Sequence, residues 1–237
     1  MKRRFLIATV AAAAIGGALY LVASRSHEPA VAGGPLTVTI AGEPLVVPPD
    51  WIRFGSQRRS GAASRLDLGL TWPDLQPEPR PGSEKPASGT TPAAAPSSAD
   101  AAAAAEAGLA KPVLVFAIEP RPTELDMAGR LGTVYARFIL PDALDAPDGL
   151  SGRKLAAGSG YEDEELYFEP GAVRPFVARC FPLERKGPIG TCLTDLNIGR
   201  GLNLSMRFPR TLLPEWHALR QAAETVSDRL LTKAGSP

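Results

Sequence analysis

The feature that most constrains this chain is an uncharged apolar run near its start, Phe5 to Ala23, which reads FLIATVAAAAIGGALYLVA. As an α-helix rising about 1.5 Å per residue, this run would be roughly 28 Å long, close to the roughly 30 Å hydrocarbon core of a bilayer. Residues 2–4 are all basic, whereas Arg25 is the one cation soon after the run. The positive-inside rule therefore predicts a cytoplasmic stub at residues 1–4, a single transmembrane helix at residues 5–23 with the lipid bilayer as its partner, and an exported remainder.

A cleaved signal peptide is the alternative interpretation of the same run, because a basic start and an apolar centre are also parts of a signal peptide. The best small-residue cleavage site is Ala30-Val31-Ala32, which lies nine residues beyond Ala23 and past the charged residues Arg25 and Glu28. The apolar run is also longer than the roughly 7–15 residues of a usual signal core. A retained membrane anchor is therefore favoured, and both interpretations export the rest of the chain.

The overall charge is nearly balanced, with a formal net charge of +1. Residues 112–237 contain 15 Lys and Arg against 16 Asp and Glu. A nucleic-acid binder needs a strongly basic face, so this composition excludes nucleic acid as the expected partner. The abundance of Ala, Arg, Gly and Pro is typical of a high-GC bacterial genome. We therefore expect a single-pass protein of the bacterial inner membrane, with its amino terminus in the cytoplasm and its carboxy-terminal domain in the periplasm.

The chain contains two cysteines, Cys180 and Cys192, both on the side that is expected to be exported. Cysteines in an oxidising compartment are expected to pair, and a bridge here would join two strand-like segments, residues 175–181 and 191–198. Two free buried thiols are the alternative. A redox-active pair is disfavoured, because the chain has no Cys-x-x-Cys spacing to lower a thiol pKa.

Alternating apolar residues predict an α+β fold, in which a mainly antiparallel sheet is followed by a carboxy-terminal amphipathic helix. Thr133–Leu140 fits either a strand or a short helix, and we assign it to a strand; residues 141–160 are predicted to be a loop. A helix is expected from Thr211 to about Lys233, with an apolar stripe of Trp216, Leu219, Ala223, Val226 and Leu230. The expected strands are residues 36–40, 45–47, 65–72, 113–118, 133–140, 165–168, 176–181, 191–198 and 203–208.

Residues 76–111 differ from the rest of the exported part, because they consist mostly of Pro, Ala, Ser, Gly and Thr. Such a segment buries too little apolar surface to offset its ordering entropy and is predicted to be disordered. The forty or so residues before it are too few to form a core alone. We therefore expect residues 36–75 and 112–237 to form one periplasmic domain, interrupted by the insertion at 76–111 and tethered to the membrane by residues 24–35.

Few residues support a catalytic or metal site. His27 and His217 are the two histidines, and neither can form a triad or a zinc site with the other. Ser151-Gly-Arg-Lys154 matches the Ser-x-x-Lys of penicillin-recognising acyl enzymes, in which the pair lies at the start of a helix. The acidic run at residues 162–165 lacks the glycine spacing of a calcium loop, and successive acids on a strand point to opposite faces. No cofactor or metal is expected.

One basic patch is a candidate for partner binding. Arg53, Arg58, Arg59 and Arg65 lie close together in the sequence, beside Trp51 and Phe54. Such a patch could bind anionic lipid head groups, an anionic cell-wall polymer or an acidic envelope protein. The alternative is an ordinary solvated loop held by a few ion pairs.

The order of the anchor, the hairpin and three later segments also carries a resemblance. The segments are IRFGSQRRSG at residues 52–61, PFVARCF at 175–181 and RFPRTLLPEW at 207–216. This order resembles a group of uncharacterised membrane-anchored periplasmic proteins of alphaproteobacteria. The resemblance implies the same topology but brings no activity, cofactor or catalytic residue.

The sequence as a whole favours a non-catalytic interaction or scaffolding protein of the cell envelope, which works through the patch from Arg53 to Arg65 or through an exposed sheet edge. Two alternatives remain open at this point. One is an envelope hydrolase or acyl enzyme that uses Ser151 and Lys154. The other is a periplasmic domain that binds a small ligand, for which the sequence identifies no pocket.

Overall fold

The structure is a computed structural model that describes residues 34–80, 111–181 and 190–232. The chain divides into two compact units, Met1–Gly34 and Pro35–Pro237, and the second unit is described here by itself. The predicted anchor at residues 5–23 and most of the predicted disordered insertion lie outside the described residues. None of the helices formed by the described residues has the length and apolar character that crossing a membrane requires.

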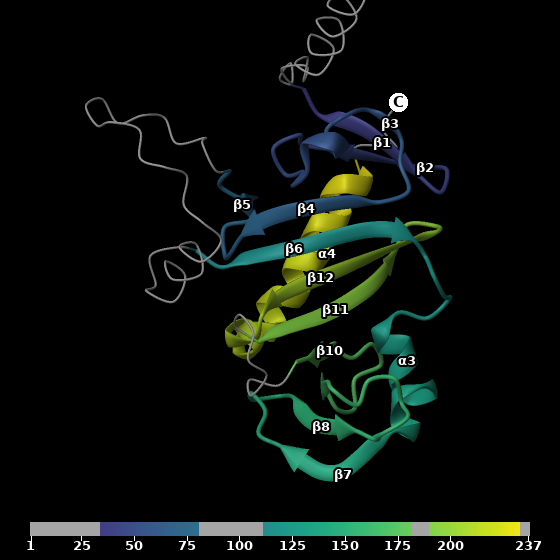
Figure 1. The fold of residues 1–237 in the computed structure, drawn as a ribbon, viewed down its shortest axis with the longest axis vertical. Helices are drawn as coiled ribbons and strands as arrows, with labels where there is room; N and C mark the ends of the chain where they lie inside the picture. The colour runs from purple at the N-terminus through teal and green to yellow at the C-terminus, as the bar shows by residue number, and fades with distance from the viewer. Residues whose placement is uncertain (1–33, 81–110, 182–189, 233–237) are drawn as a thin grey trace, which may run out of the picture. The chain divides into compact units, whose positions relative to one another are not determined.

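A nine-stranded antiparallel sheet formed by the described residues is the main element of the second unit (Figure 1). β4 pairs with β6 along its whole length, so the sheet joins segments on both sides of the insertion. The antiparallel sheet and the carboxy-terminal helix confirm the predicted α+β class. In spatial order the strands are β5 (Gln76–Pro77), β4 (Leu66–Thr71), β6 (Val113–Pro120), β12 (Leu202–Pro209), β11 (Thr191–Ile198), β10 (Val177–Cys180), β9 (Glu165–Phe168), β8 (Ser151–Leu155) and β7 (Ile139–Leu144).

A small sheet with the order β2-β1-β3 precedes the large one. β1 (Leu36–Ile40) and β2 (Glu43–Val47) form the predicted hairpin, and β3 (Gly61–Ala62) adds to β1 in parallel. The carboxylate of Glu43 accepts hydrogen bonds from the backbone N–H groups of Arg200 and Gly201, in the turn between β11 and β12. The hairpin of the small sheet is thereby attached to the large sheet.

The carboxy-terminal helix α4 (Trp216–Thr232) covers the main apolar core. All five residues of the predicted apolar stripe are buried, and α4 contacts both β12 and β2. The predicted start at Thr211 is wrong for an α-helix, because residues Arg210–Glu215 form the 3₁₀ helix η3, with Pro214 inside it. Proline lacks the N–H that a regular helix interior needs, and the α-helix begins only after it.

A second core lies on the opposite face of the sheet. Its cover consists of α3 (Met127–Thr133) and the 3₁₀ helix η2 (Tyr135–Arg137), which follow β6 in the chain. Adjacent residues of a strand face opposite sides, and β10 shows this directly, because Val177 belongs to the second core and Ala178 to the first. The two helical covers therefore use the two faces of the same strands.

The predicted strand at Thr133–Leu140 is wrong. Residues up to Thr133 belong to α3, residues 135–137 form η2, and β7 starts only at Ile139. The reason lies at the start of the helix, where the side chain of Asp126 accepts a hydrogen bond from the N–H of Gly129. This cap supports a short helix that its two glycines and β-branched end would disfavour.

The predicted loop at residues 141–160 is also wrong, because most of it forms β7 and β8. Pro141 is tolerated because β7 is an edge strand, where a missing N–H breaks no bond to an outer neighbour. Gly152 in β8 lies under Tyr167 of the neighbouring strand; a Cβ there would come within 2.9 Å of the tyrosine ring. Pro141 and Gly152, which in the sequence indicate a loop, are therefore both accommodated in the paired strands β7 and β8.

Candidate binding groove

The predicted disulfide is confirmed, and it marks the place where the large sheet divides. Cys180 and Cys192 are bonded to each other and lie directly opposite in the register of β10 and β11. The register contains one further pair, Arg179 opposite Leu193. Beyond it, β10 continues beside β9 while β11 continues beside β12. The stretch 194–198 of β11 therefore has β12 on one side and, among the described residues, no strand on the other.

A groove with a volume of about 580 Å³ occupies this division of the sheet. β11, α4, the first turn of α3 and residues 174–177 line this groove. Apolar side chains from all of these elements and several charged ones contribute to the lining. The lining residues are Asp126, Ala128, Arg174, Pro175, Phe176, Val177, Thr194, Asp195, Leu196, Asn197, Ile198, Gly199, Arg220, Ala223, Glu224, Ser227, Asp228 and Leu231.

Asp195 fixes the first turn of α3 against β11. Its carboxylate accepts hydrogen bonds from the backbone N–H of Met127 at 2.7 Å and from the guanidinium of Arg130 at 2.6 Å. Burial raises the pKa of Asp195 above its ordinary value and outweighs the opposite effects of Met127 and Arg130. A carboxyl group with a raised pKa that lines a groove is a common property of a binding site.

The loop before β10 supplies a basic part of the groove. Arg220 of α4 donates to the carboxylate of Glu169 at 2.8 Å and to the backbone oxygen of Arg174 at 3.1 Å. Burial acts to raise the pKa of Glu169, but the N–H of Phe176 and the guanidinium of Arg220 outweigh it, so this pKa is lowered. These bonds hold the loop that carries Arg174 against the helix.

The polar side chains of α4 continue along the groove. Arg220, Glu224 and Asp228 are four positions apart in turn, and Ser227 follows Glu224 by three, a spacing that places them on one side of a helix. On α4 the buried residues Ala223 and Ser227 and the exposed residues Glu224 and Asp228 all line the groove. The sequence analysis identified the stripe but not this second use of the same helix.

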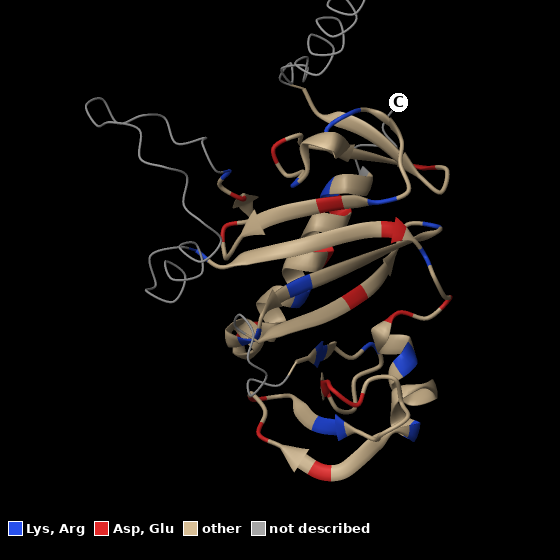
Figure 2. Cartoon of the chain, viewed as in Figure 1, with Lys and Arg blue, Asp and Glu red and all other residues tan. Residues whose placement is uncertain are grey.

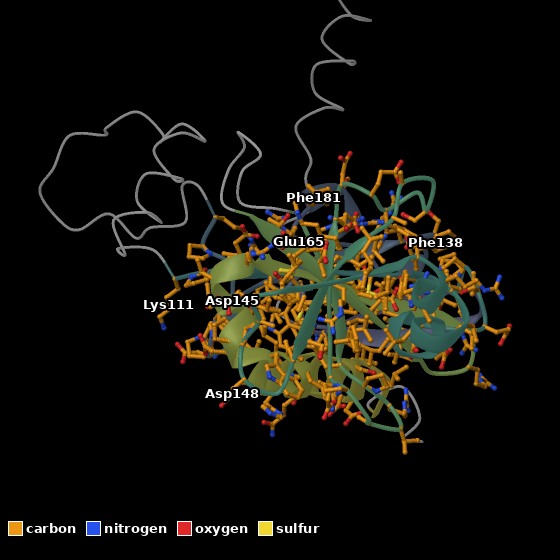
Figure 3. All side chains as sticks on the ribbon, turned by 90° about the horizontal axis from the view of Figure 1, so that it is seen from below. Lys111, Phe138, Asp145, Asp148, Glu165 and Phe181 are labelled. Atoms are coloured by element: carbon orange, nitrogen blue, oxygen red, sulfur yellow. A yellow bond between two sulfur atoms is a disulfide. The ribbon has the colours of Figure 1, made fainter. Side chains whose placement is uncertain are left out.

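Arg210 contacts β9 and the residue that follows β10. It pairs with Glu165 at 2.5 Å and donates to the backbone oxygen of Phe181 at 3.2 Å. Figure 3, seen from below, labels Glu165 and Phe181, which lie near each other beside the disulfide strands. Burial and a hydrogen bond to Glu165 raise the pKa of the neighbouring Tyr167 to about 12.

The four arginines of the predicted basic patch come from the stretch between β2 and the start of β4; Figure 2 colours the Lys and Arg residues of the chain blue. Arg53 pairs with Glu78 at 2.7 Å, and Arg58 donates to the backbone oxygen of Ile52. Arg65 lies after β3 and pairs with Asp67 and with Glu119 at the end of β6. Arg59 is exposed on the loop before β3. Three of the four cations thus have partners within the chain.

Asp67 anchors the loop that carries this patch. Its burial acts to raise the pKa, but hydrogen bonds from Arg65 and Gln57 outweigh burial and hold the pKa of Asp67 below its ordinary value. Gln57 also accepts the backbone N–H of Asp67 through its side-chain oxygen. The loop is therefore fixed to β4 by a reciprocal pair of bonds.

The helix-start geometry that the Ser-x-x-Lys hypothesis requires is absent at Ser151 and Lys154. Both residues belong to β8, where they pair with Phe168 and Glu165 of β9. Residues three apart on a strand point to opposite faces, so the hydroxyl and the amine do not converge. Within the described ranges, no group of three or more His, Cys, Asp or Glu side chains is arranged to hold a metal ion.

Comparison with known proteins gives no family for this chain. No family model matches the sequence, and no curated protein matches it. Among solved structures, the iron-regulated outer membrane lipoprotein FrpD of Neisseria meningitidis is similar at a TM-score of 0.43. The identity is 10%, over 86% of this chain and 93% of that one. The groove must therefore be interpreted from its own residues.

Proposed function

We propose that this chain is a non-catalytic, membrane-anchored binding protein of the bacterial cell envelope that holds an extended peptide segment of another envelope protein in the groove between β11 and α4. The observation that carries the proposal is the division of the sheet after Leu193, which leaves residues 194–196 of β11 facing a groove instead of a strand. The next residue, Asn197, already donates its backbone N–H to Asp126 and its side-chain amide to the backbone oxygen of Glu124. A strand side without a neighbour is a recurring site for an added peptide strand.

The lining of the groove favours a peptide with apolar and basic side chains. Phe176, Ile198 and Leu231 offer apolar contacts at different points along the groove. The carboxylates that line it outnumber the arginines, and Arg220 already pairs with Glu169. Complementary charge across an interface favours the matching partner and speeds its association.

The proposed location depends on the first residues and on the disulfide. A cysteine pair that bridges two strands fits a compartment outside the cytoplasm, where disulfides persist. The run at residues 5–23 supplies the proposed inner-membrane anchor, with the amino terminus in the cytoplasm and the described unit in the periplasm. In this arrangement the groove is held close to other proteins of the envelope.

Peptide display on the purified full-length chain tests the proposed function. The probe is a library of random peptides, selected first on the wild-type protein and then on two charge-reversal variants. Glu224→Lys changes an exposed residue of the groove, whereas Glu162→Lys makes the same change at an exposed residue before β9. We expect enriched peptides with Lys or Arg among apolar residues, with at least tenfold weaker binding to Glu224→Lys and unchanged binding to Glu162→Lys.

Two results would overturn the proposal. One is the absence of any enriched peptide on a protein whose disulfide is intact. The other is an equal effect of both variants on the enriched peptides, which would place the binding outside the groove. Binding of a small apolar molecule in the groove, with no peptide selected, would favour the ligand-binding alternative instead.

A further inference from the structure

We propose that the end of the small sheet at which the described unit begins rests on the bilayer and binds anionic lipid head groups. We call this surface the amino-terminal rim and define it by Pro35, Phe54, Arg59, Ser60 and Arg80. The inference rests on the membrane anchor of the proposed function and adds a second membrane contact to it. It concerns a different surface from the groove.

The pairing of β3 with β1 brings one basic residue to the rim. β3 runs parallel to β1, with Gly61 opposite Val38, and the hydroxyl of Ser60 accepts the backbone N–H of Thr37 at 3.2 Å. Arg59 precedes Ser60 and is exposed. It therefore lies next to the first residues of β1, where the chain continues towards the proposed anchor.

A second basic residue arrives at the same end through β2. Leu36 pairs with Val47, so the residues directly after Val47 also lie at the start of β1. The guanidinium of Arg80 donates to the backbone oxygens of Pro49 and Asp50, at 3.4 Å and 3.1 Å. Two arginines from segments far apart in the sequence are thus held at the same end of the small sheet.

An exposed aromatic side chain accompanies these cations. Phe54 is 52% exposed, and the guanidinium of Arg53 lies 6.0 Å from its ring. Phe54 and Arg80 line a common cavity of about 270 Å³. Aromatic residues are enriched at the interface of a membrane with water, and basic residues near the surface are attracted to anionic lipids.

The length of the tether makes this contact possible. Residues 24–34 connect the predicted span to Pro35, and eleven residues extend to at most about 40 Å. The tether ends at Pro35, which is itself part of the rim, so a contact of the rim with lipid needs no chain length beyond the tether. The interaction also needs proximity, since salt screens charges over about 8–10 Å.

Site-specific photo-crosslinking to lipid tests the rim. The full-length protein is reconstituted in vesicles of phosphatidylcholine, with or without phosphatidylglycerol, and carries benzoylphenylalanine at position 54. The matched control carries it at position 140, because Leu140 is 36% exposed in β7, the strand at the far edge of the sheet. We expect lipid adducts at position 54 but not at position 140, and severalfold more of them when phosphatidylglycerol is present.

Two charge-reversal variants then distinguish a specific effect of Arg59 from a general effect of the protein's net charge. Arg59→Glu removes the cation of the rim, whereas Arg137→Glu changes an exposed arginine of η2. The first variant should lose the dependence on phosphatidylglycerol, and the second should keep it. If the protein remains in the vesicles, an absence of adducts at position 54, or equal labelling at positions 54 and 140, would overturn the proposed lipid contact of the rim. Loss of the protein from the vesicle fraction would overturn the anchor and, with it, the inference.

Discussion

The two cores on opposite faces of the large sheet are built differently. The core under α4 is almost entirely apolar and draws residues from the small sheet, the long strands β4, β6 and β12, and the helix itself. The core under α3 and η2 is smaller and adjoins several charged side chains. Arg130 pairs with Asp195, and Arg179 pairs with Glu164 while its guanidinium lies 4.3 Å from the ring centre of Tyr161.

The difference shows what a short helix needs to cover a sheet. α4 has 17 residues and can exclude water with apolar side chains alone, whereas α3 has 7 residues and buries few apolar side chains. Ion pairs and a cap must therefore position it. The hydroxyl of Tyr135, buried in the second core, has no hydrogen-bond partner among the described residues, and burial raises its pKa. We expect the first core to set the stability of the unit and the second to set the shape of the groove.

The largest effect should come from the apolar core. Phe116 in β6 is fully buried, and Phe116→Ala should lower the free energy of unfolding by about 3–5 kcal/mol, because both apolar burial and packing are lost. Urea denaturation followed by tryptophan fluorescence measures the change. Leu140→Ala on the exposed edge is the control and should change stability by less than about 0.5 kcal/mol. If Phe116→Ala lowers the free energy of unfolding by less than Arg130→Met does, the first core does not set the stability of the unit.

Removal of the disulfide should have the next largest effect, because it joins the strands that the two cores share. The double variant Cys180→Ala, Cys192→Ala should unfold with a free energy lower by on the order of 3 kcal/mol, as expected for a closed loop of this length. Denaturation with and without reductant measures the change. The wild type should become less stable in reductant, and the variant should not respond. Equal denaturation midpoints for both oxidised proteins would contradict the expected contribution.

Disruption of the ion pair beside the second core should cost somewhat less. Arg130→Met leaves the carboxylate of Asp195 without its cation and should lower stability by about 2–3 kcal/mol. This value is below the usual range for a buried pair, because the two side chains retain 19% and 12% exposure. The double variant Arg130→Met, Asp195→Asn should recover most of the loss, as measured by thermal unfolding. A failure to recover would mean that packing of Arg130, not its charge, supports α3.

The smallest effect should be a change in pH dependence. Because the pKa of Asp195 is raised in the folded state, the folded protein binds this proton more strongly than the unfolded chain. The favourable contribution is present at a pH below the ordinary pKa and is lost as pH rises through the raised folded value. Asp195→Asn should therefore gain stability relative to the wild type as pH rises across this window, in a series of denaturation curves. A constant difference would show that the carboxyl does not titrate with folding.

Much of the large sheet could be predicted from sequence, because its strands bury one face along their length. The strands predicted at residues 191–198 and 203–208 are confirmed by β11 and β12. β7 was missed because it is an exposed edge, which needs no apolar alternation and accepts Pro141. α3 was missed because its stability depends on Asp195, which is distant in sequence.

The groove could not be predicted for a related reason. Thr191–Ile198 has one continuous strand pattern, and nothing in it indicates that its pairing with β10 ends after Leu193. The division of the sheet depends on where α3 and the loop before β10 insert, which is a property of the folded unit. The disulfide was predictable because it depends only on cysteine count and compartment. Sequence proximity, by contrast, does not reveal that Arg53 pairs with Glu78 and Arg65 with Glu119.

The disulfide Cys180–Cys192 lies at one of the two residue pairs that join β10 and β11. This position has a consequence for when the protein can act. The covalent bond holds β10 and β11 together one residue pair before the point at which they separate. Without it, the separation could move along the strands, and the width of the groove would vary. We expect a chain retained in the reducing cytoplasm to lack a defined groove, so that oxidation after export would determine both stability and the ability to recognise a partner.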